Sequence, residues 1–230
     1  MNQDQDVAKL VSMRVYITEL LGTFILIFCG TGAIIINQQT EGAIGHVGIA
    51  ITFGLTVMTL IYAFGSISGA HFNPAVTISF TVAGKSPLKN LIPYITAQLT
   101  GAIAASLVLK ILFPFSTYLG ATIPSGSSIQ SFVLELFLSF FLMLVIINVS
   151  HGSKEQGMFA GLAIGATVLL EAMFAGPISG ASMNPVRSMA PALVSGHLEY
   201  LWIYVIATVT GALLSVPVWN YISKVKTENI

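Results

Sequence analysis

Long apolar stretches separated by short polar ones dominate the pattern of this chain. A helix of about 20 apolar residues is long enough to cross the hydrocarbon core of a bilayer. Six stretches reach or approach this length, and each is predicted to form a membrane-spanning helix. The predicted helices cover residues 15–37, 47–65, 91–112, 132–149, 157–174 and 200–221.

Two further apolar segments, residues 73–83 and 184–194, are too short to cross a bilayer. Each begins with an Asn-Pro pair, at Asn73-Pro74 and at Asn184-Pro185. Asn caps a helix because its side-chain oxygen accepts a free backbone N–H, and proline suits the first helical position. We interpret both segments as re-entrant half-helices, which are possible only where protein or water satisfies the backbone.

The two Asn-Pro pairs belong to an internal duplication. Each half of the chain has three predicted spans with a half-helix before the third, and this odd number of spans inverts the second half relative to the first. We expect one domain over residues 1–230, with repeats at about 14–112 and 130–222. The duplicated sequence is Ile67-Ser68-Gly69-Ala70-x-x-Asn73-Pro74, which returns 111 residues later as Ile178-Ser179-Gly180-Ala181-x-x-Asn184-Pro185; Glu19 matches Glu135, and Thr100-Gly101-Ala102 matches Thr210-Gly211-Ala212.

The composition agrees with an all-α membrane protein. Hydrophobic residues make up 55% of the chain and charged residues 8%, whereas soluble domains contain about 25% charged residues. The mean hydropathy is +0.87. The net charge is zero and no basic patch is present, which argues against a nucleic-acid partner and leaves membrane lipid as the surroundings. Residues 1–12 lack the basic region and cleavage site of a secretory signal, so we expect the first span to be retained.

The charges predict the orientation of the chain in the membrane. Cytoplasmic loops carry an excess of lysine and arginine, and most basic residues fall on the side of the two termini. Both termini are therefore expected to be cytoplasmic in a multi-pass protein of the cell membrane, with the long connection 113–130 outside. The basic residues on the terminal side are Lys9, Arg14, Lys85, Lys89, Lys154, Lys224 and Lys226; Lys110 and Arg187 lie elsewhere.

The pattern of reactive side chains does not indicate an enzyme. Cys29 is the only cysteine, no His, Cys and carboxylate residues have metal-ligand spacing, and no nucleophile is paired with a base. We expect no metal and no cofactor. Arg187 lies at membrane depth, where an isolated arginine is costly, so its side chain is expected to line water and to hydrogen-bond a solute.

The two boxes resemble those of the aquaporin, or major intrinsic protein, family, and the resemblance covers the whole chain. The segment from Gly176 to Pro185 and Trp202-Ile203-Tyr204 are most similar to the plant nodulin-like branch and its bacterial relatives. The second box carries Val186 where the family usually has alanine. The residues behind the resemblance are the box from Ser68 through Asn73-Pro74-Ala75 to Val76, the box from Ser179 through Asn184-Pro185-Val186 to Ser188, Phe53-Gly54-Leu55-Thr56-Val57, and Ala97-Gln98.

The resemblance implies a passive channel for water and small uncharged solutes that excludes protons and ions. Asn73 and Asn184 would meet at the pore centre, with the positive ends of both half-helices facing each other. Carbonyl groups of two extended stretches, residues 66–72 and 177–183, would accept hydrogen bonds along the path. The usual assembly of the family, and so the expected one, is a homotetramer with one pore per subunit.

The resemblance also assigns four positions to a selectivity filter. They are Phe53 in the second span, Ala172, Ala181 and Arg187. Two alanines would make this filter wider than one water molecule, so glycerol, urea or neutral arsenous, boric or silicic acid are expected to pass. Ser188 stands where glycerol-selective relatives carry an aspartate, so the filter matches neither usual type.

The remaining ionisable residues within the spans are Glu19, Glu135 and Glu171. By resemblance, Glu19 and Glu135 are buried acceptors for the re-entrant loops, and Glu171 is interpreted as a further acceptor for the second loop rather than a pore-facing charge. His71, beside the first box, either faces the pore or is a hydrogen-bonded wall residue.

Three other functions are compatible with parts of the pattern. A strictly water-selective aquaporin would share the fold and the Asn-Pro boxes, although such members of the family carry a histidine at the position of Ala172. A proton-coupled secondary transporter would share the inverted repeats and half-helices but needs a titratable group at the midplane. A cation channel is disfavoured by two positive helix ends and Arg187.

Overall fold

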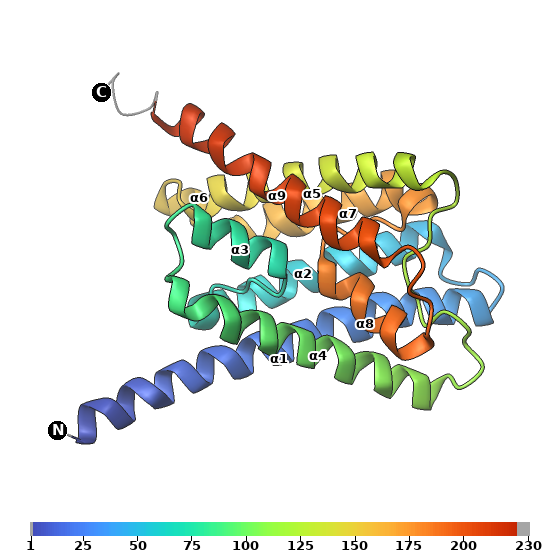
Figure 1. The fold of residues 1–230 in the computed structure, drawn as a ribbon, viewed down its shortest axis with the longest axis horizontal. Coiled ribbons are helices and arrows are strands. Elements are labelled where there is room, and N and C mark those ends of the chain that lie inside the picture. The colour runs from blue at the N-terminus through green and yellow to red at the C-terminus, as the bar shows by residue number, and fades with distance from the viewer. Residues whose placement is uncertain (1, 225–230) are drawn as a thin grey trace.

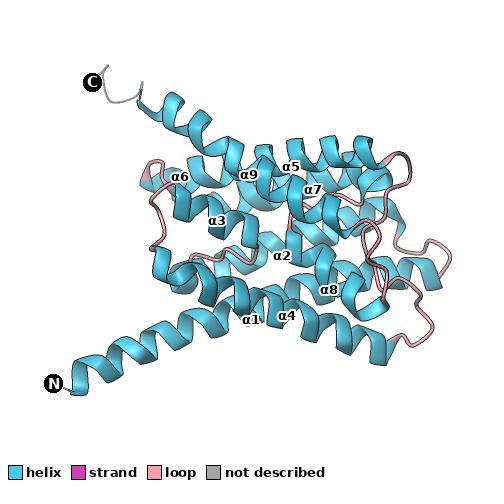
Figure 2. Ribbon diagram, in the orientation of Figure 1, coloured by secondary structure: helices cyan, strands magenta, loops and turns pink. Residues whose placement is uncertain are grey.

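The computed structural model describes the backbone of residues 2–224 and the side chains of residues 13–223. Figure 2 shows helices joined by loops throughout this part of the chain. Six of its helices are long and apolar enough to cross a membrane, as expected. The helices are α1 (Asn2–Gln39), α2 (Gly45–Ser68), α3 (Pro74–Val82), α4 (Leu91–Leu112), α5 (Ser128–Ser150), α6 (Lys154–Met158), α7 (Ala160–Ser179), α8 (Pro185–Ser195) and α9 (Leu201–Lys224).

The two half-helices α3 and α8 start near the middle of the molecule and run toward opposite ends (Figure 1). Both termini lie at one end, which we call the terminal end, and the connection between α4 and α5 lies at the other, the far end. The helix α3 runs toward the terminal end and α8 toward the far end. The arrangement of three long helices and one half-helix therefore occurs twice, with opposite directions.

The long helices pack through glycines that match between the two halves. α1 packs against α4 and α5 against α9. At Gly101 of α4 a side chain would collide with the Leu20 carbonyl of α1, and at Gly211 of α9 one would collide with the Leu136 carbonyl of α5. Close backbone approach at small residues is a common way for helices to associate in membranes. These two crossings hold the outer helices of each half together.

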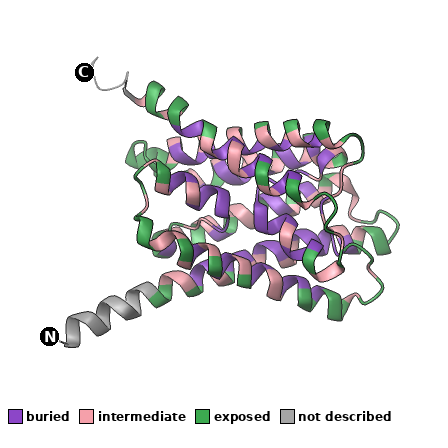
Figure 3. Ribbon diagram, viewed as in Figure 1, coloured by how far each residue is buried: buried purple, intermediate pink, exposed green. Residues whose placement is uncertain are grey.

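The two halves meet where α2 crosses α7, at a third pair of glycines. A Cβ at Gly54 would lie 2.6 Å from the Gly165 carbonyl oxygen, and a Cβ at Gly165 would lie 2.7 Å from that of Gly54. Figure 3 shows that buried residues face the centre of the bundle and exposed residues its outside. Large exposed side chains on that outside are apolar, including Ile92, Ile111 and Phe174, as expected for a surface in contact with lipid.

The sequence analysis placed the fifth span incorrectly at both ends. Residues 154–158 form the separate helix α6, which begins with a capping box between Ser153 and Gln156, and α7 continues through Pro177 to Ser179. Pro177 cannot donate a hydrogen bond to the Met173 carbonyl. The Nε2 of His46 lies 2.8 Å from that carbonyl oxygen and takes the place of the missing donor.

The basic residues expected on one side follow this architecture. Arg14 lies in α1, Lys85 and Lys89 lie between α3 and α4, and Lys154 begins α6; these segments are at the terminal end (Figure 1). Lys226 lies outside the described residues, as do the side chains of Lys9 and Lys224. Lys110 donates to the Val194 carbonyl at the end of α8 (2.9 Å).

Candidate functional site

Each half-helix begins at an asparagine cap followed by a proline. The Oδ1 of Asn73 accepts the N–H of Ala75 at 2.9 Å, and the Oδ1 of Asn184 accepts the N–H of Val186 at 3.1 Å. Pro74 and Pro185 occupy the first helical positions. Valine in the second box leaves this cap unchanged, because the cap uses only the backbone N–H of residue 186.

The two asparagines also connect the halves of the chain. The Nδ2 of Asn73 donates to the Met183 carbonyl (2.7 Å), and the Nδ2 of Asn184 donates to the Phe72 carbonyl (2.9 Å). A side-chain amide has two N–H donors, so each asparagine keeps one hydrogen for another acceptor. The two residues are thus structural braces as well as candidate donors to a solute.

The loops before the half-helices have an unusual backbone. Gly69 ends α2 and Gly180 ends α7 in the left-handed conformation, with φ of 84° and 86°. Two non-glycine residues of each loop also have positive φ: Ala70 (51°) and Phe72 (48°) in the first, Ala181 (42°) and Met183 (54°) in the second. Such conformations cost on the order of 1–3 kcal/mol each and persist only where the surroundings enforce them.

The predicted extended stretches are therefore shorter than expected. Residues 66–68 and 177–179 are helical, because α2 and α7 continue to the left-handed glycines. Only residues 69–73 and 180–184 are free to present backbone groups outside a helix.

A buried glutamate holds each loop from behind. The carboxyl group of Glu19 accepts the N–H groups of His71 (3.0 Å) and Phe72 (2.8 Å). The carboxyl group of Glu135 accepts those of Ser182 (2.8 Å) and Met183 (2.9 Å). Both glutamates are fully buried. Ser68 and Ser179 add a hydroxyl donor each, at 2.7 Å. These bonds supply the surroundings that enforce the strained backbone.

Two tyrosines to which the sequence analysis gave no role in the site complete the support. The hydroxyl of Tyr94 donates to the Ser68 carbonyl and that of Tyr204 donates to the Ser179 carbonyl, both at 2.7 Å. Gln98 also donates to Glu19 at 2.8 Å. The tyrosines have the same spacing as the matched Thr-Gly-Ala triplets of their helices, so the internal repeat contained a signal for them.

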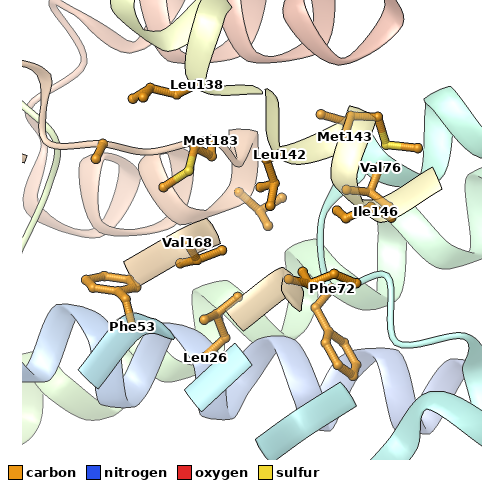
Figure 4. Close-up of a cluster of buried hydrophobic side chains, with 14 of the residues drawn as sticks. Leu26, Phe53, Phe72, Val76, Leu138, Leu142, Met143, Ile146, Val168 and Met183 are labelled. Carbon is orange, nitrogen blue, oxygen red and sulfur yellow. The ribbon is translucent and has the colours of Figure 1, made fainter. Parts of the chain in front are cut away.

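A cavity of about 520 Å³ lies between the half-helices and the long helices. Both asparagines and both loops line it, and it extends from Arg187 and Phe53 to Ser150 and Met158 near α6. Most of its remaining wall is apolar. Figure 4 shows Leu26, Phe53, Leu142 and Val168 among these side chains, together with Phe72 and Met183 from the two loops. The cavity thus has a mainly apolar wall that carries a small number of polar groups.

Phe53, Ala181 and Arg187 meet at one end of this cavity, and we call them the arginine site. The guanidinium carbon of Arg187 lies 5.0 Å from the centre of the Phe53 ring. Its NH1 group donates to the Gly120 carbonyl at 2.8 Å, while Nε has no partner among the described residues. Three of the four predicted filter residues therefore come together.

The fourth predicted filter residue, Ala172, does not line the cavity. It is buried in the same apolar cluster as Phe53 and Ala181, and Val168, one turn earlier on α7, lines the cavity instead. Counting along the sequence identifies the turn of the helix but not the direction of the side chain.

Glu171 does not support the second loop, contrary to expectation. Among the described residues none donates a hydrogen bond to it, and its Oε2 is buried without a partner. The N–H groups of Ser182 and Met183 in this loop already donate to Glu135.

His71 has both features that the sequence analysis left as alternatives. It lines the cavity, and its Nδ1 lies 3.1 Å from the Thr77 hydroxyl. The same hydroxyl oxygen lies 3.1 Å from the Asn73 carbonyl oxygen, so His71 is connected to the cap of the first half-helix. Cys29 is half-buried in α1 and is not among the lining residues.

Comparisons with known proteins agree with this geometry. The family model for major intrinsic proteins matches residues 6–219. Aquaporin NIP1-1 of Zea mays is 47% identical over 207 residues, which are 90% of this chain and 73% of that protein. Nodulin-26 of Glycine max is 44% identical over 207 residues, covering 90% of this chain and 76% of that protein.

A solved structure shares the fold. The X-ray structure of the aquaglyceroporin from Plasmodium falciparum matches with a TM-score of 0.80 and 28% identity, over 92% of this chain and 96% of that one. These similarities confirm the resemblance seen in the two Asn-Pro boxes, and the chain belongs to the major intrinsic protein family.

Proposed function

We propose that the protein is a passive channel that carries water and small uncharged solutes through the cavity between its half-helices. The observation behind this proposal is the meeting of two asparagine-capped helix N-termini in the wall of one continuous cavity. Membership of the major intrinsic protein family makes the chain a membrane channel and not an enzyme.

The two helix ends supply a selective field at the centre of the path. Each N-terminus carries the equivalent of about half a positive elementary charge. Together they repel cations, including hydronium ions. The free hydrogen of each asparagine amide is donated to the oxygen of a passing molecule, which turns that molecule away from a continuous chain of proton-conducting hydrogen bonds.

Arg187 forms the second polar site along the path. Its guanidinium is fixed by Gly120 and Phe53, and it adds one full positive charge at the cavity end. A solute hydroxyl or carbonyl oxygen accepts a hydrogen bond there, while the Phe53 ring and Ala181 contact its apolar side. This combination suits small polyols, urea and neutral arsenous, boric or silicic acid, for which a methyl group at residue 181 leaves room.

We place the protein in the cell membrane with both termini in the cytoplasm, because the segments with Arg14, Lys85, Lys89 and Lys154 share the terminal end. We also propose a homotetramer with one pore in each subunit. Crosslinking of the protein in native membranes tests the assembly, and protease access to each end tests the orientation.

Reconstitution into vesicles tests the transport function. Purified protein is expected to accelerate osmotic shrinkage and the entry of glycerol, urea and boric acid above the rate of protein-free lipid, with no membrane current. Solute rates equal to those of lipid would contradict the proposal. Water flux without solute flux would identify a strictly water-selective channel.

A proton-coupled transporter is the other candidate, because Glu171 carries a titratable carboxyl group within α7, and its Oε2 is buried without a partner among the described residues. Such a transporter would accumulate solute against its gradient when a pH gradient is applied. Flux that follows only the solute gradient would exclude it.

A further inference from the structure

Three hydroxyl groups form a connected chain behind the second half-helix. Thr122, in the connection between α4 and α5, donates to the Ser188 hydroxyl at 2.7 Å. The Ser182 and Ser188 hydroxyl oxygens lie 2.6 Å apart, and Ser182 donates to the Asn184 carbonyl at 2.8 Å. All three residues are buried, and Ser182 also lines the cavity.

One arrangement of hydrogens satisfies all of these bonds. A hydroxyl has one hydrogen to donate. With the Ser182 hydrogen on the Asn184 carbonyl, Ser188 donates to Ser182. Thr122 then donates to Ser188, as its geometry indicates. The chain runs in one direction from the connecting segment to the backbone of the asparagine cap.

The hydroxyl chain closes a ring of hydrogen bonds around Arg187. The Asn184 carbonyl, at the end of the chain, also accepts the backbone N–H of Arg187 at 3.2 Å. The side chain of Arg187 donates to the Gly120 carbonyl at 2.8 Å. Gly120 lies two residues before Thr122, where the chain begins. The backbone and the guanidinium of Arg187 are therefore both bonded to the same ring of hydrogen bonds, one at each end of the hydroxyl chain.

The segment that carries the Gly120 carbonyl is anchored on its other side as well. A side chain at Gly120 would collide with Thr31 of α1, whose Cβ would lie 2.8 Å away. Leu119 packs in a small cluster with Ile35 and Leu109. Val194 of α8 also packs against this cluster, and the N–H of Ser125 donates to the Ile178 carbonyl of α7 at 2.9 Å. Thr122 is the residue of this segment whose side chain hydrogen-bonds a side chain of the half-helix.

The first half of the chain lacks such a ring. The positions that match Arg187 and Ser188, 111 residues earlier, are Val76 and Thr77. Thr77 donates directly to the Asn73 carbonyl and accepts from Gln98 at 3.0 Å. Among the described residues the ring occurs only in the half with the arginine. Its role therefore differs from that of the hydrogen bonds that support both half-helices alike.

We propose that Thr122 and Ser188 are positioning residues that hold the Gly120 carbonyl against Arg187 and so determine which solutes pass the arginine site. This inference rests on the proposed channel function. Without the Thr122 hydroxyl the segment that carries the Gly120 carbonyl loses its hydrogen bond to the half-helix, the guanidinium is held less firmly, and the site becomes wider and less selective.

The test compares Thr122→Val with Thr122→Ser in reconstituted vesicles. The ratio of glycerol to water permeability is expected to rise about fivefold in Thr122→Val, the factor that corresponds to the ~1 kcal/mol net contribution of one hydrogen bond. Thr122→Ser keeps the hydroxyl and is expected to keep the wild-type ratio. Ser188→Ala is expected to match Thr122→Val, and the double variant to add nothing further, because both changes break the same chain.

Ser106→Ala is the control, since the Ser106 hydroxyl is equally buried but has no partner among the described residues. Its ratio is expected to equal that of the wild type. An unchanged ratio in folded Thr122→Val and Ser188→Ala, in vesicles that conduct normally, would overturn the inference and leave the channel function intact.

Hydrogen exchange gives a readout that does not depend on transport. Backbone amides of residues 114–127 are expected to exchange faster in Thr122→Val than in Thr122→Ser. Equal exchange in the two variants would overturn the positioning role of Thr122, whether or not the wild type carries solute. A wild type that carries no solute would separately contradict the proposed function.

Discussion

At the scale of single residues, the width of the path near Arg187 depends on two neighbouring positions of α7. Ala172 shares the apolar cluster of the arginine site, and Val168 lines the cavity. Sequence spacing favoured Ala172, whereas the side-chain directions favour Val168. The two assignments predict different effects of substitution.

Ala172→His is expected to lower the ratio of glycerol to water permeability about tenfold, because a bulky imidazole in the apolar cluster beside the cavity narrows the path for the larger solute. Stopped-flow light scattering on reconstituted vesicles measures the ratio. Val168→Ala is the companion variant. A ratio unchanged by Ala172→His but raised by Val168→Ala would assign the filter position to Val168.

Ala181 provides a chemical test of the lining. A thiolate that water can reach reacts with mercurials. Ala181→Cys is expected to become sensitive to mercury and to recover with a thiol reductant, whereas the wild type, whose Cys29 is absent from the lining, should resist. Sensitivity of the wild type that disappears in Cys29→Ser would instead place Cys29 on the path.

At the scale of the elements, one contact compensates for the proline near the end of α7. His46 of α2 donates to the Met173 carbonyl, which Pro177 cannot reach with an N–H. A Cβ at Gly176 would lie 2.7 Å from the His46 ring, so ring and helix are in close contact. This contact ties the start of α2 to the end of α7, next to the strained second loop.

His46→Ala is expected to destabilise the protein by roughly 0.5–1.5 kcal/mol, the net contribution of one hydrogen bond, because the contact with the Met173 carbonyl is only part-buried. Thermal unfolding in detergent measures the loss. Pro177→Ala restores a backbone donor to Met173, so the double variant should be more stable than His46→Ala alone. Equal stability of the single and double variants would show that the Met173 carbonyl does not need the histidine.

The elements differ in how well the sequence predicts them. The bounds of α4 agree with the expected span, and both half-helices begin at their predicted caps, since Asn-Pro signals act locally. The C-terminal end of the fifth span was misplaced because the donor that replaces the missing N–H of Pro177 at the Met173 carbonyl is His46, 127 residues away. Glu171, Val168 and Thr122 were misjudged or missed for the same reason, since their roles depend on which distant residues lie beside them.

At the scale of the whole molecule, an aromatic cluster connects three elements at the terminal end. His151, just after α5, lies 5.7 Å from the ring of Phe80 in α3 and 6.1 Å from that of Trp219 in α9. Lys85 lies 5.1 Å from the centre of the Trp219 ring. Partial burial, and next the positive charge of Lys85, lower the pKa of His151 below its ordinary value of 6.5.

This lowered pKa predicts a pH dependence of stability. The folded protein favours neutral His151, so its contribution is complete above pH 6.5 and is lost as the pH falls from 6.5 through the folded-state pKa. The melting temperature of the wild type is expected to fall more between pH 7.5 and 5 than that of His151→Gln. Parallel curves for the two proteins would exclude His151 as the source.

The braces between the half-helices have a consequence for the order of assembly. Asn73 depends on the Met183 carbonyl, and Asn184 on the Phe72 carbonyl, yet synthesis proceeds from the N-terminus. When the first three spans have entered the bilayer, residue 183 has not been made. The first half alone therefore contains half of a path with an unsupported end. The path is completed only when the second half docks, so a membrane is not made leaky by chains that are still growing.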